Sequence, residues 1–346
     1  MKRKGFTLVE LLVVIAIIAL LMSILMPTLA MVRKMAQRAV CGSNLSGIHK
    51  AMLAYMQDNE EDCPRAGGKL STWNATANWK ATTPLPLEAT AFAETQLGSP
   101  YPVGTYGAGK ATISASLYLL IKWADVSPKS FICKGEKGAK IFSLTEAVGG
   151  PSPLTQLKQA FDFGPVSTVS TEKNIGLYVS QYNSYAYQIP YVNGTSAFFQ
   201  LSSSSPSGLA VLADKSPYFV ISPDAARPAY EYDIALNADG ALRHSEQLEK
   251  WGNSANHDSD GQNVLFNDGA VSFNNVPYCG MNNDNIYTIA STTVRREAGS
   301  LPNITSTPSI TGSTPMFRTS TIPQSAVDSL LLNEGGKQGG IVPVTQ

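Results

Sequence analysis

The chain opens with a short basic segment and then an apolar run long enough to cross a membrane. Residues 2–4 are basic, and the run from Phe6 to Met26 is apolar except for Thr7, Glu10 and Ser23. About 20 apolar residues in a helix span a hydrocarbon core of roughly 30 Å. Because positive charge tends to stay in the cytoplasm, the sequence predicts a single span with the remainder of the chain on the outer side.

The carboxylate of Glu10 is the unusual member of this run. A charged group within a span costs about 2.5–3.5 kcal/mol on insertion scales, so it normally has a partner and a function. An ordinary secretory signal is the alternative, but its apolar region has about 7–15 residues and a small-residue cleavage site follows it. A plain signal-anchor explains the span but not the order Gly-Phe-Thr-Leu-Val-Glu at 5–10.

Residues 4–11, Lys-Gly-Phe-Thr-Leu-Val-Glu-Leu, resemble the class III signal of type IV prepilins and type II secretion pseudopilins. The resemblance implies that a membrane aspartic prepilin peptidase cleaves between Gly5 and Phe6, and that the new amine is methylated to give N-methylphenylalanine. It also implies that the Glu10 carboxylate forms an ion pair with the terminal amine of a neighbouring subunit. An ammonium and a carboxylate attract strongly at low dielectric, and each offsets the desolvation cost of the other.

The same resemblance implies an α+β fold, in which a long N-terminal transmembrane helix packs on an antiparallel β-sheet head, as in pilins. The predicted division is a cleaved leader at 1–5, a membrane and assembly helix at 6–57, an extracytoplasmic head at 58–299 and a tail at 300–346. The tail is rich in Ser, Thr, Pro and Gly, a composition typical of linkers and weakly ordered segments. Residues 326–332 are its one candidate for a helical turn or two.

The apolar pattern continues beyond the predicted span. Pro27 is expected to loosen or kink the helix, because it removes a backbone donor and clashes with the preceding turn. Leu45, Ile48, Met52 and Tyr55 then recur at helical steps and predict a stripe that packs on the head. The whole helix would be about 75 Å long at 1.5 Å per residue.

Charge and cysteine content limit the function classes. The 346 residues include 26 basic and 26 acidic ones, and no basic run follows the leader, so nucleic-acid binding has no electrostatic basis. Cys41, Cys63, Cys133 and Cys279 form no CxxC pair, and their spacings suit no zinc site. Outside the cytoplasm they allow two disulfides in three connectivities. At least one disulfide is predicted, with buried free thiols as the alternative.

Several strands and one helix are predicted within the head. The patterns indicate a short helix at 116–123, a strand-like segment at 131–133, one or two strands within 175–189 and a buried strand at 208–214.

The clearest local prediction is a hairpin centred on Asp268-Gly269. Apolar residues flank this dipeptide on both sides, and Asp-Gly favours a two-residue type I′ turn. The side chains that this register places together on the core face are Val264, Phe266, Val271 and Phe273.

This hairpin carries a second resemblance. His257 followed by Asp268-Gly269 resembles the His-X9-Asp-Gly segment of a large bacterial subset of prepilin-leader proteins, although residues 258–267 make this copy one residue longer. The interpretation favoured here is structural: His257 and Asp268 cap and fix the loop that enters the hairpin. A catalytic or metal pair is the alternative. Further stretches that resemble the subset are 41–45, 116–120, 131–133 and 213–217.

No enzyme signature stands out. The sequence has neither a Gly-x-Ser-x-Gly elbow nor a His-Glu-x-x-His pair, and the glycine-rich run ending at Lys110 lacks the P-loop hydroxyl, because Ala111 follows. Residues 258–261, Asp-Ser-Asp-Gly, are similar to a calcium loop but lack a third ligand position and the distal Glu. A solvated acidic loop is therefore favoured, with calcium as the alternative, and no other cofactor is expected.

Two functions follow from the sequence. The favoured one is a non-enzymatic pilin or pseudopilin-like subunit that assembles through its N-terminal helix into an extracytoplasmic filament of a type II secretion or type IV pilus-like system. Its expected partners are prepilin peptidase, other pilin subunits and the lipid bilayer. Its expected location is the inner membrane, in a single pass, with the head in the periplasm or at the cell surface. The alternative is a surface module that binds or degrades polysaccharide and uses the same anchor.

Overall fold

The structure is a computed structural model of the 346-residue chain. The residues that it describes are 8–59, 61–66, 72–73, 110–111, 113–143, 156–159, 162–163, 181–190, 201–216, 253–281, 284, 286–287 and 329–332.

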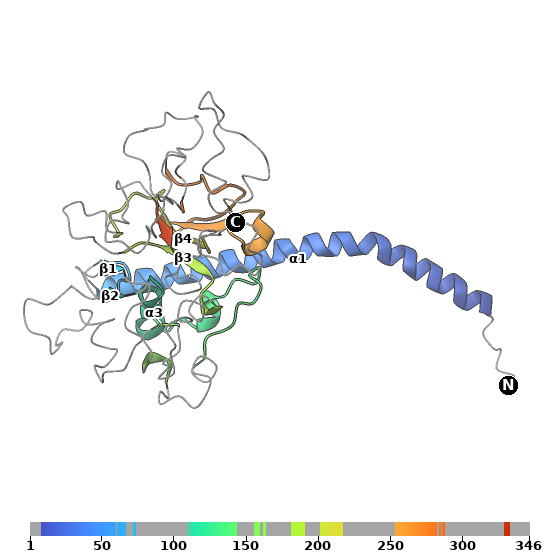
Figure 1. The fold of residues 1–346 in the computed structure, drawn as a ribbon, viewed down its shortest axis with the longest axis horizontal. Helices are drawn as coiled ribbons and strands as arrows, with labels where there is room; N and C mark the ends of the chain where they lie inside the picture. Colours follow the sequence, from blue (N-terminus) through green and yellow to red (C-terminus); the bar gives the residue numbers. More distant parts are fainter. Residues whose placement is uncertain are drawn as a thin grey trace, which may run out of the picture.

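A single long helix, α1 (Leu8–Asp58), dominates the molecule and extends far beyond the head (Figure 1). Its 51 residues correspond to about 75 Å at 1.5 Å per residue. The helix continues without a break through Pro27. Figure 1 shows that the projecting half is curved, and the kink expected at Pro27 stays a prediction.

The two halves of α1 differ in burial. Residues 8–36 are all exposed, whereas the second half buries one face against the head. The buried face contains Leu45, Ile48, Met52 and Tyr55, so the stripe expected from helical spacing is confirmed. These positions lie three or four residues apart and therefore share one side of the helix.

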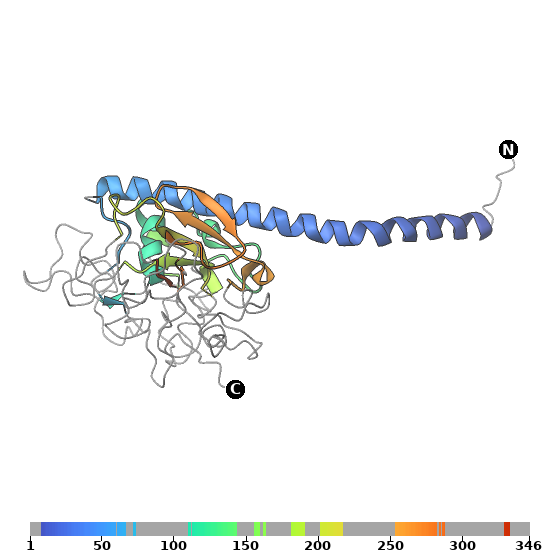
Figure 2. The same cartoon turned by 90° about the horizontal axis from the view of Figure 1, so that it is seen from above.

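The head is built on a five-stranded antiparallel sheet with the strand order β6-β5-β4-β3-β7. The expected α+β architecture, with a long helix packed on an antiparallel sheet, is thus confirmed, and Figure 2 shows the second half of α1 lying along one side of the sheet. The strands of this sheet are β3 (Tyr185–Gln188), β4 (Ala210–Asp214), β5 (Gln262–Phe266), β6 (Val271–Asn274) and β7 (Leu331–Leu332). A separate parallel pair joins β1 (Thr72–Trp73) to β2 (Lys110–Ala111).

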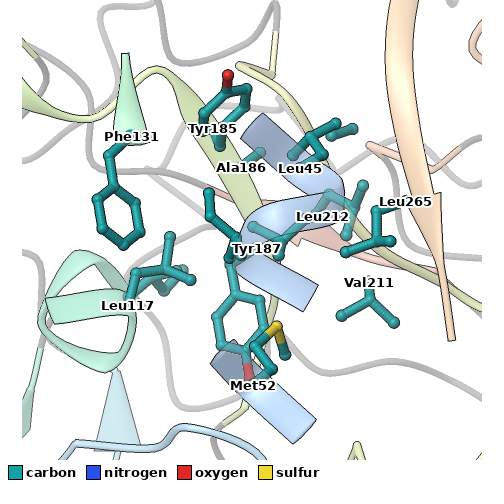
Figure 3. Close-up of a cluster of buried hydrophobic side chains, with 14 of the residues drawn as sticks. Leu45, Met52, Leu117, Phe131, Tyr185, Ala186, Tyr187, Val211, Leu212 and Leu265 are labelled. Atoms are coloured by element: carbon teal, nitrogen blue, oxygen red, sulfur yellow. The ribbon is translucent and has the colours of Figure 1, made fainter. Parts of the chain in front are cut away.

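The core lies between α1, the sheet and a second helix, α3 (Ile113–Trp123), which the sequence predicted at 116–123. Figure 3 shows side chains from all three meeting, with Tyr187 of β3 beside Met52 of α1 and Leu117 of α3 close by. Tyr187 and Leu117 are fully buried. Burying an apolar side chain of this size contributes about 1.5–3 kcal/mol, so this contact fixes the helix on the head.

The strand-like segment at 131–133 is not a strand. Residues Pro128–Phe131 form a 3-10 helix, η1, and Ile132 follows it in an extended conformation. The Lys129 N–H donates to the Ser127 hydroxyl at 3.4 Å. Proline is favoured in the first turn of a helix and Ser at its N-cap, so local capping outweighs the apolar character of the segment. Two further 3-10 helices are η2 (Leu157–Gln159) and η4 (Asn256–Ser259).

Part of the C-terminal tail belongs to the sheet, contrary to expectation. Strand β7 pairs with β3 through Leu331–Gln188 and Leu332–Tyr187, and both leucines are fully buried. The helical turn suggested for 326–332 is therefore wrong at Leu331–Leu332. Apolar burial against β3 decides their conformation, and the Leu330 N–H donates to Gln188 Oε1 at 2.6 Å. The rest of the tail lies outside the described residues.

The hairpin forms at the expected place but in a different register. Val264 pairs with Ser272 and Leu265 with Val271, one residue away from the predicted pairing. The Gly269 N–H donates to Phe266 O at 2.9 Å, and Gly269 has a positive φ of 87°, whereas Asp268 does not. This is a three-residue loop with a glycine in the left-handed region, so the type I′ prediction is wrong.

Tertiary hydrogen bonds explain the longer loop. The N–H groups of Asn267 and Asp268 donate to the carbonyls of Leu209 and Ser207 at 2.9 and 3.2 Å. The shift places Leu265 and Val271 on the face toward α1, while Val264 turns to the opposite face and is also buried.

Gly269 is needed both for its backbone conformation and for the space that it leaves. A Cβ at this position would lie 2.9 Å from His49 Nε2 on α1. A non-glycine residue in the left-handed region adds about 1–2 kcal/mol of strain. We therefore expect Gly269→Ala to lower the stability of the full chain in detergent by about 1–3 kcal/mol, measured by thermal unfolding. An unchanged melting temperature would show that the hairpin loop is not fixed as described.

Candidate functional site

Two parts of the molecule are candidate functional sites, and the first is the N-terminal half of α1. Gly5 and Phe6 lie outside the described residues, so cleavage and methylation stay predictions. Glu10 lies in the first turn of α1 and is exposed. Within the described residues, α1 is the one helix long and apolar enough to cross a membrane, and its apolar half has no side chain buried by the head.

The second part is a buried cluster of four side chains from distant segments, here called the buried cluster: Cys41, Cys133, Asp214 and His257. Their sulfur, oxygen and nitrogen atoms all lie within 4.8 Å of one another. Cys41 comes from α1, Cys133 follows η1, Asp214 ends β4, and His257 lies in η4 just before β5. All four residues are buried, and His257 is the most exposed at 5%.

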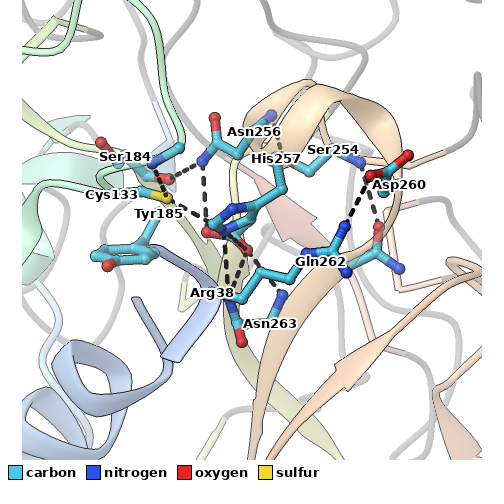
Figure 4. A network of polar contacts seen from close by, with 12 residues as sticks. Arg38, Cys133, Ser184, Tyr185, Ser254, Asn256, His257, Asp260, Gln262 and Asn263 are labelled. Atoms are coloured by element: carbon cyan, nitrogen blue, oxygen red, sulfur yellow. Dashed lines mark hydrogen bonds and ion pairs between the residues drawn. The ribbon is translucent and has the colours of Figure 1, made fainter. Parts of the chain in front are cut away.

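His257 directs one ring nitrogen at the cluster. Its Nε2 lies 3.3 Å from Cys133 Sγ, and both residues are labelled in Figure 4. The same Nε2 lies 3.3 Å from Asp214 Oδ2. The opposite nitrogen packs against Gly135, where a Cβ would lie only 2.4 Å from Nδ1. A Cys-His-Asp catalytic triad needs the acid and the nucleophile on different ring nitrogens. Because both contacts converge on Nε2, the arrangement does not fit a triad.

Asparagine side chains and backbone N–H groups orient the other members. Asp214 Oδ2 accepts from the backbone and side-chain N–H groups of Asn263 at 2.7 and 3.2 Å, and Asp214 Oδ1 accepts from Asn256 at 3.4 Å. Cys133 Sγ accepts from the Gly135 N–H at 3.3 Å. Apart from His257, the groups that hold the carboxylate and the thiol in place carry no charge.

The electrostatics of the cluster set Cys41 apart from the other three cysteines. A hydrogen bond from the Cys133 thiol lowers the pKa of Cys41 to about 6, and the pKa of Cys133 is raised. Burial lowers the pKa of His257, but the hydrogen bonds and charges of Asp214 and Cys41 together outweigh burial and bring the pKa to about 9. By contrast, burial raises the pKa of Cys63 and of Cys279 to about 12.

The backbone around His257 is strained. His257, Asp258 and Ser259 have positive φ values of 58°, 59° and 61°. Each such residue costs about 1–2 kcal/mol, and strain of this kind persists only where surrounding contacts impose it. Asn253 supplies one such contact, because its side-chain N–H group donates to the Ser259 carbonyl at 3.3 Å.

Ion pairs tie the same loop to α1. Asp258 lies 3.0 Å from Lys34 and 3.3 Å from Lys137, and Asp260 lies 2.8 Å from Arg38. The hydrogen bond from Lys34 lowers the pKa of Asp258. Both carboxylates of the calcium-like sequence thus face cations of the chain, and calcium would have to displace them.

The two ends of the His-Asp-Gly segment do not meet. Strand β5 separates them, so His257 reaches Cys41 and Asp214 while Gly269 packs on His49. His257 and Asp268 therefore do not contact each other, because a strand of five residues is about 17 Å long. Asp268 Oδ1 accepts from the Ala270 N–H at 2.9 Å, and the structural role of the two residues stays a prediction. Strand β5 lies along α1. The segment contacts this helix before the strand, through His257 and Cys41, and after it, through Gly269 and His49.

The structure shows no disulfide, since the four cysteines are free thiols. It does bring Cys41 and Cys133 together. The argument from cysteine spacing, which excluded a zinc site, missed this contact. The sequence analysis did not name Asp214 as a site residue. A signal was present nevertheless. Each member of the buried cluster lies in a stretch in which the chain resembles the His-X9-Asp-Gly subset, at 41–45, 131–133, 213–217 and His257.

Comparison with known proteins bears on the N-terminal half. A family model described as the prokaryotic N-terminal methylation motif matches residues 1–26. The chain carries a prepilin-type N-terminal methylation motif. The prepilin resemblance of residues 4–11 is thereby confirmed.

This pilin-like chain also has a distant pilin homologue over a short N-terminal stretch. It is 48% identical over 56 residues to the type IV wide pilus major component PilA4 of Thermus thermophilus. The match covers 16% of this chain and 43% of the relative's length. No solved structure matches.

Proposed function

We propose that this pilin-like chain is a subunit of an extracytoplasmic filament of a type IV pilus-like or type II secretion system. Prepilin peptidase cleaves it between Gly5 and Phe6, and the Phe6 amine is methylated. The chain crosses the inner membrane once, with the head outside the cytoplasm, and assembles with other pilin subunits. The prepilin motif at residues 1–26 supports this proposal.

The observation that carries the proposal is the exposed apolar half of α1. Every described residue from 8 to 36 is exposed, although most of these side chains are aliphatic. Isolated in water such a surface would be unstable, so it needs lipid or other apolar helices around it. A bilayer covers this apolar surface before assembly, and a bundle of identical helices covers it afterwards.

Glu10 has a natural role in such a bundle. It lies near the start of the exposed half, in the first turn of α1. In a bundle of staggered subunits its carboxylate meets the free Phe6 amine of a neighbour, and neither charge is then left alone at low dielectric. Cleavage creates that amine, so processing and assembly are linked.

Processing is the direct test of the proposal. Purified mature protein is expected to begin with methylated Phe6, read by N-terminal sequencing and mass spectrometry. Gly5→Val should leave the unprocessed chain in the membrane, because a β-branched side chain beside the scissile bond blocks the peptidase. A mature protein that starts beyond Ala30 would mean an ordinary signal peptide and would contradict the proposal.

The buried cluster does not support the surface-module alternative. All four of its side chains are buried, so a polysaccharide could not reach them.

A further inference from the structure

We propose that Cys41, Cys133, Asp214 and His257 bind a structural zinc ion that fastens α1 to the head. This inference is independent of the proposed function, because it rests only on the buried cluster. The four residue types are all established zinc ligands, and the pair of thiolates favours zinc over the hard cations calcium and magnesium.

The spacing of the donor atoms fits one tetrahedral ion. Zinc bonds of about 2.3 Å to sulfur, about 2.0–2.1 Å to nitrogen and about 2.0–2.2 Å to oxygen place neighbouring donors roughly 3.3–3.8 Å apart. His257 Nε2 lies 3.3 Å from both Cys133 Sγ and Asp214 Oδ2, and all four donors lie within 4.8 Å of one another. The donors thus lie close enough together to bind one ion after small adjustments.

The surroundings are those of a metal site. Asp214 accepts two hydrogen bonds from Asn263, and the Cys133 sulfur accepts one from the Gly135 N–H. Such outer contacts orient the ligands of protein metal sites and are part of their affinity. The packing of Gly135 on Nδ1 keeps the His257 ring turned so that Nε2 faces the cluster.

The site is closed, which indicates a structural role. Four protein donors complete a tetrahedron and leave no open position for water or substrate, unlike catalytic zinc sites. All four residues are buried as well. Zinc would therefore join α1, the segment after η1, the end of β4 and the entry to β5 at one point. An ion that binds only the folded chain stabilises the fold, because its binding free energy adds to the free energy of folding.

The test uses the full chain, purified in detergent without chelators. Its zinc content is measured by inductively coupled plasma mass spectrometry. We expect about one zinc per chain. The stripped and reduced chain should take up Co²⁺ and show thiolate-to-cobalt charge transfer together with the intense visible bands of a tetrahedral ion. Chelation should lower the melting temperature.

Variants locate the site. Cys133→Ser and the isosteric Asp214→Asn should lose most of the bound zinc, whereas Cys279→Ser, a matched change at a cysteine outside the cluster, should keep it. If Cys133→Ser fails to fold, the cobalt spectrum of the unaltered chain still decides. Absence of both zinc and a thiolate–cobalt spectrum would overturn the proposal. A Cys41–Cys133 disulfide in the chain isolated from cells would overturn it too, as would equal zinc loss in Cys279→Ser.

Discussion

We expect the Glu10→Ala chain to enter the membrane normally and to fail to assemble. Removing the carboxylate favours insertion by up to about 2.5–3.5 kcal/mol, so the helix still inserts into the membrane. In the assembled bundle, however, the Phe6 amine of the neighbour loses its counter-charge, and breaking a buried pair costs about 3–5 kcal/mol. At each subunit contact that loss corresponds to a factor of more than a hundred in association. In-cell crosslinking measures it as the yield of oligomers.

The controls separate charge from general damage. Glu10→Asp keeps the charge but withdraws it by one methylene, and its oligomer yield should be intermediate. Glu61→Gln removes a carboxylate from the head, where its partner is the Ser203 hydroxyl at 2.8 Å, and should assemble normally. Equal oligomer yields from Glu10→Ala and the unaltered chain would contradict the proposed role of Glu10.

Gly135→Ala is expected to disrupt the buried cluster. Gly135 does not have a positive φ, so alanine fits its backbone, and the effect is purely steric. The new Cβ would lie 2.4 Å from Nδ1 of His257 and 3.0 Å from its backbone nitrogen. The ring cannot retreat easily, because the other side of it contacts Asp214 and Cys133. We expect a loss of about 1–3 kcal/mol, the usual cost of overpacking a core.

Thermal unfolding of the full chain in detergent measures this loss, and maleimide labelling of Cys133, located by peptide mapping, should become faster. Gly47→Ala is the matched control, because a Cβ there has nothing within 4 Å. In the interior of α1 it should be neutral or stabilise by up to about 1 kcal/mol. If the two alanine variants melted alike, the packing of Gly135 against His257 would be less tight than described.

The hairpin illustrates how far local sequence rules reach. Alternation and the Asp-Gly pair located both strands and the turn correctly. The register was off by one residue, because the turn is chosen by hydrogen bonds from Asn267 and Asp268 to the chain before β4. Those bonds join residues about sixty positions apart, and no local propensity predicts them. Strand β7 was missed for the same reason, since only burial against β3 makes Leu331 and Leu332 a strand.

The sequence by itself determined the basic N-terminus and the long helix that follows it. The basic leader, the apolar run, Glu10 and the stripe from Leu45 to Tyr55 follow from composition and period, because a helix is defined by contacts between near neighbours. Only the tertiary structure decided the buried cluster. Cys41, Cys133, Asp214 and His257 are separated by dozens of residues, and their meeting depends on how α1, β4 and β5 pack. A spacing rule for zinc ligands uses only short sequence separations between ligands. It therefore could not find a site assembled from four distant segments.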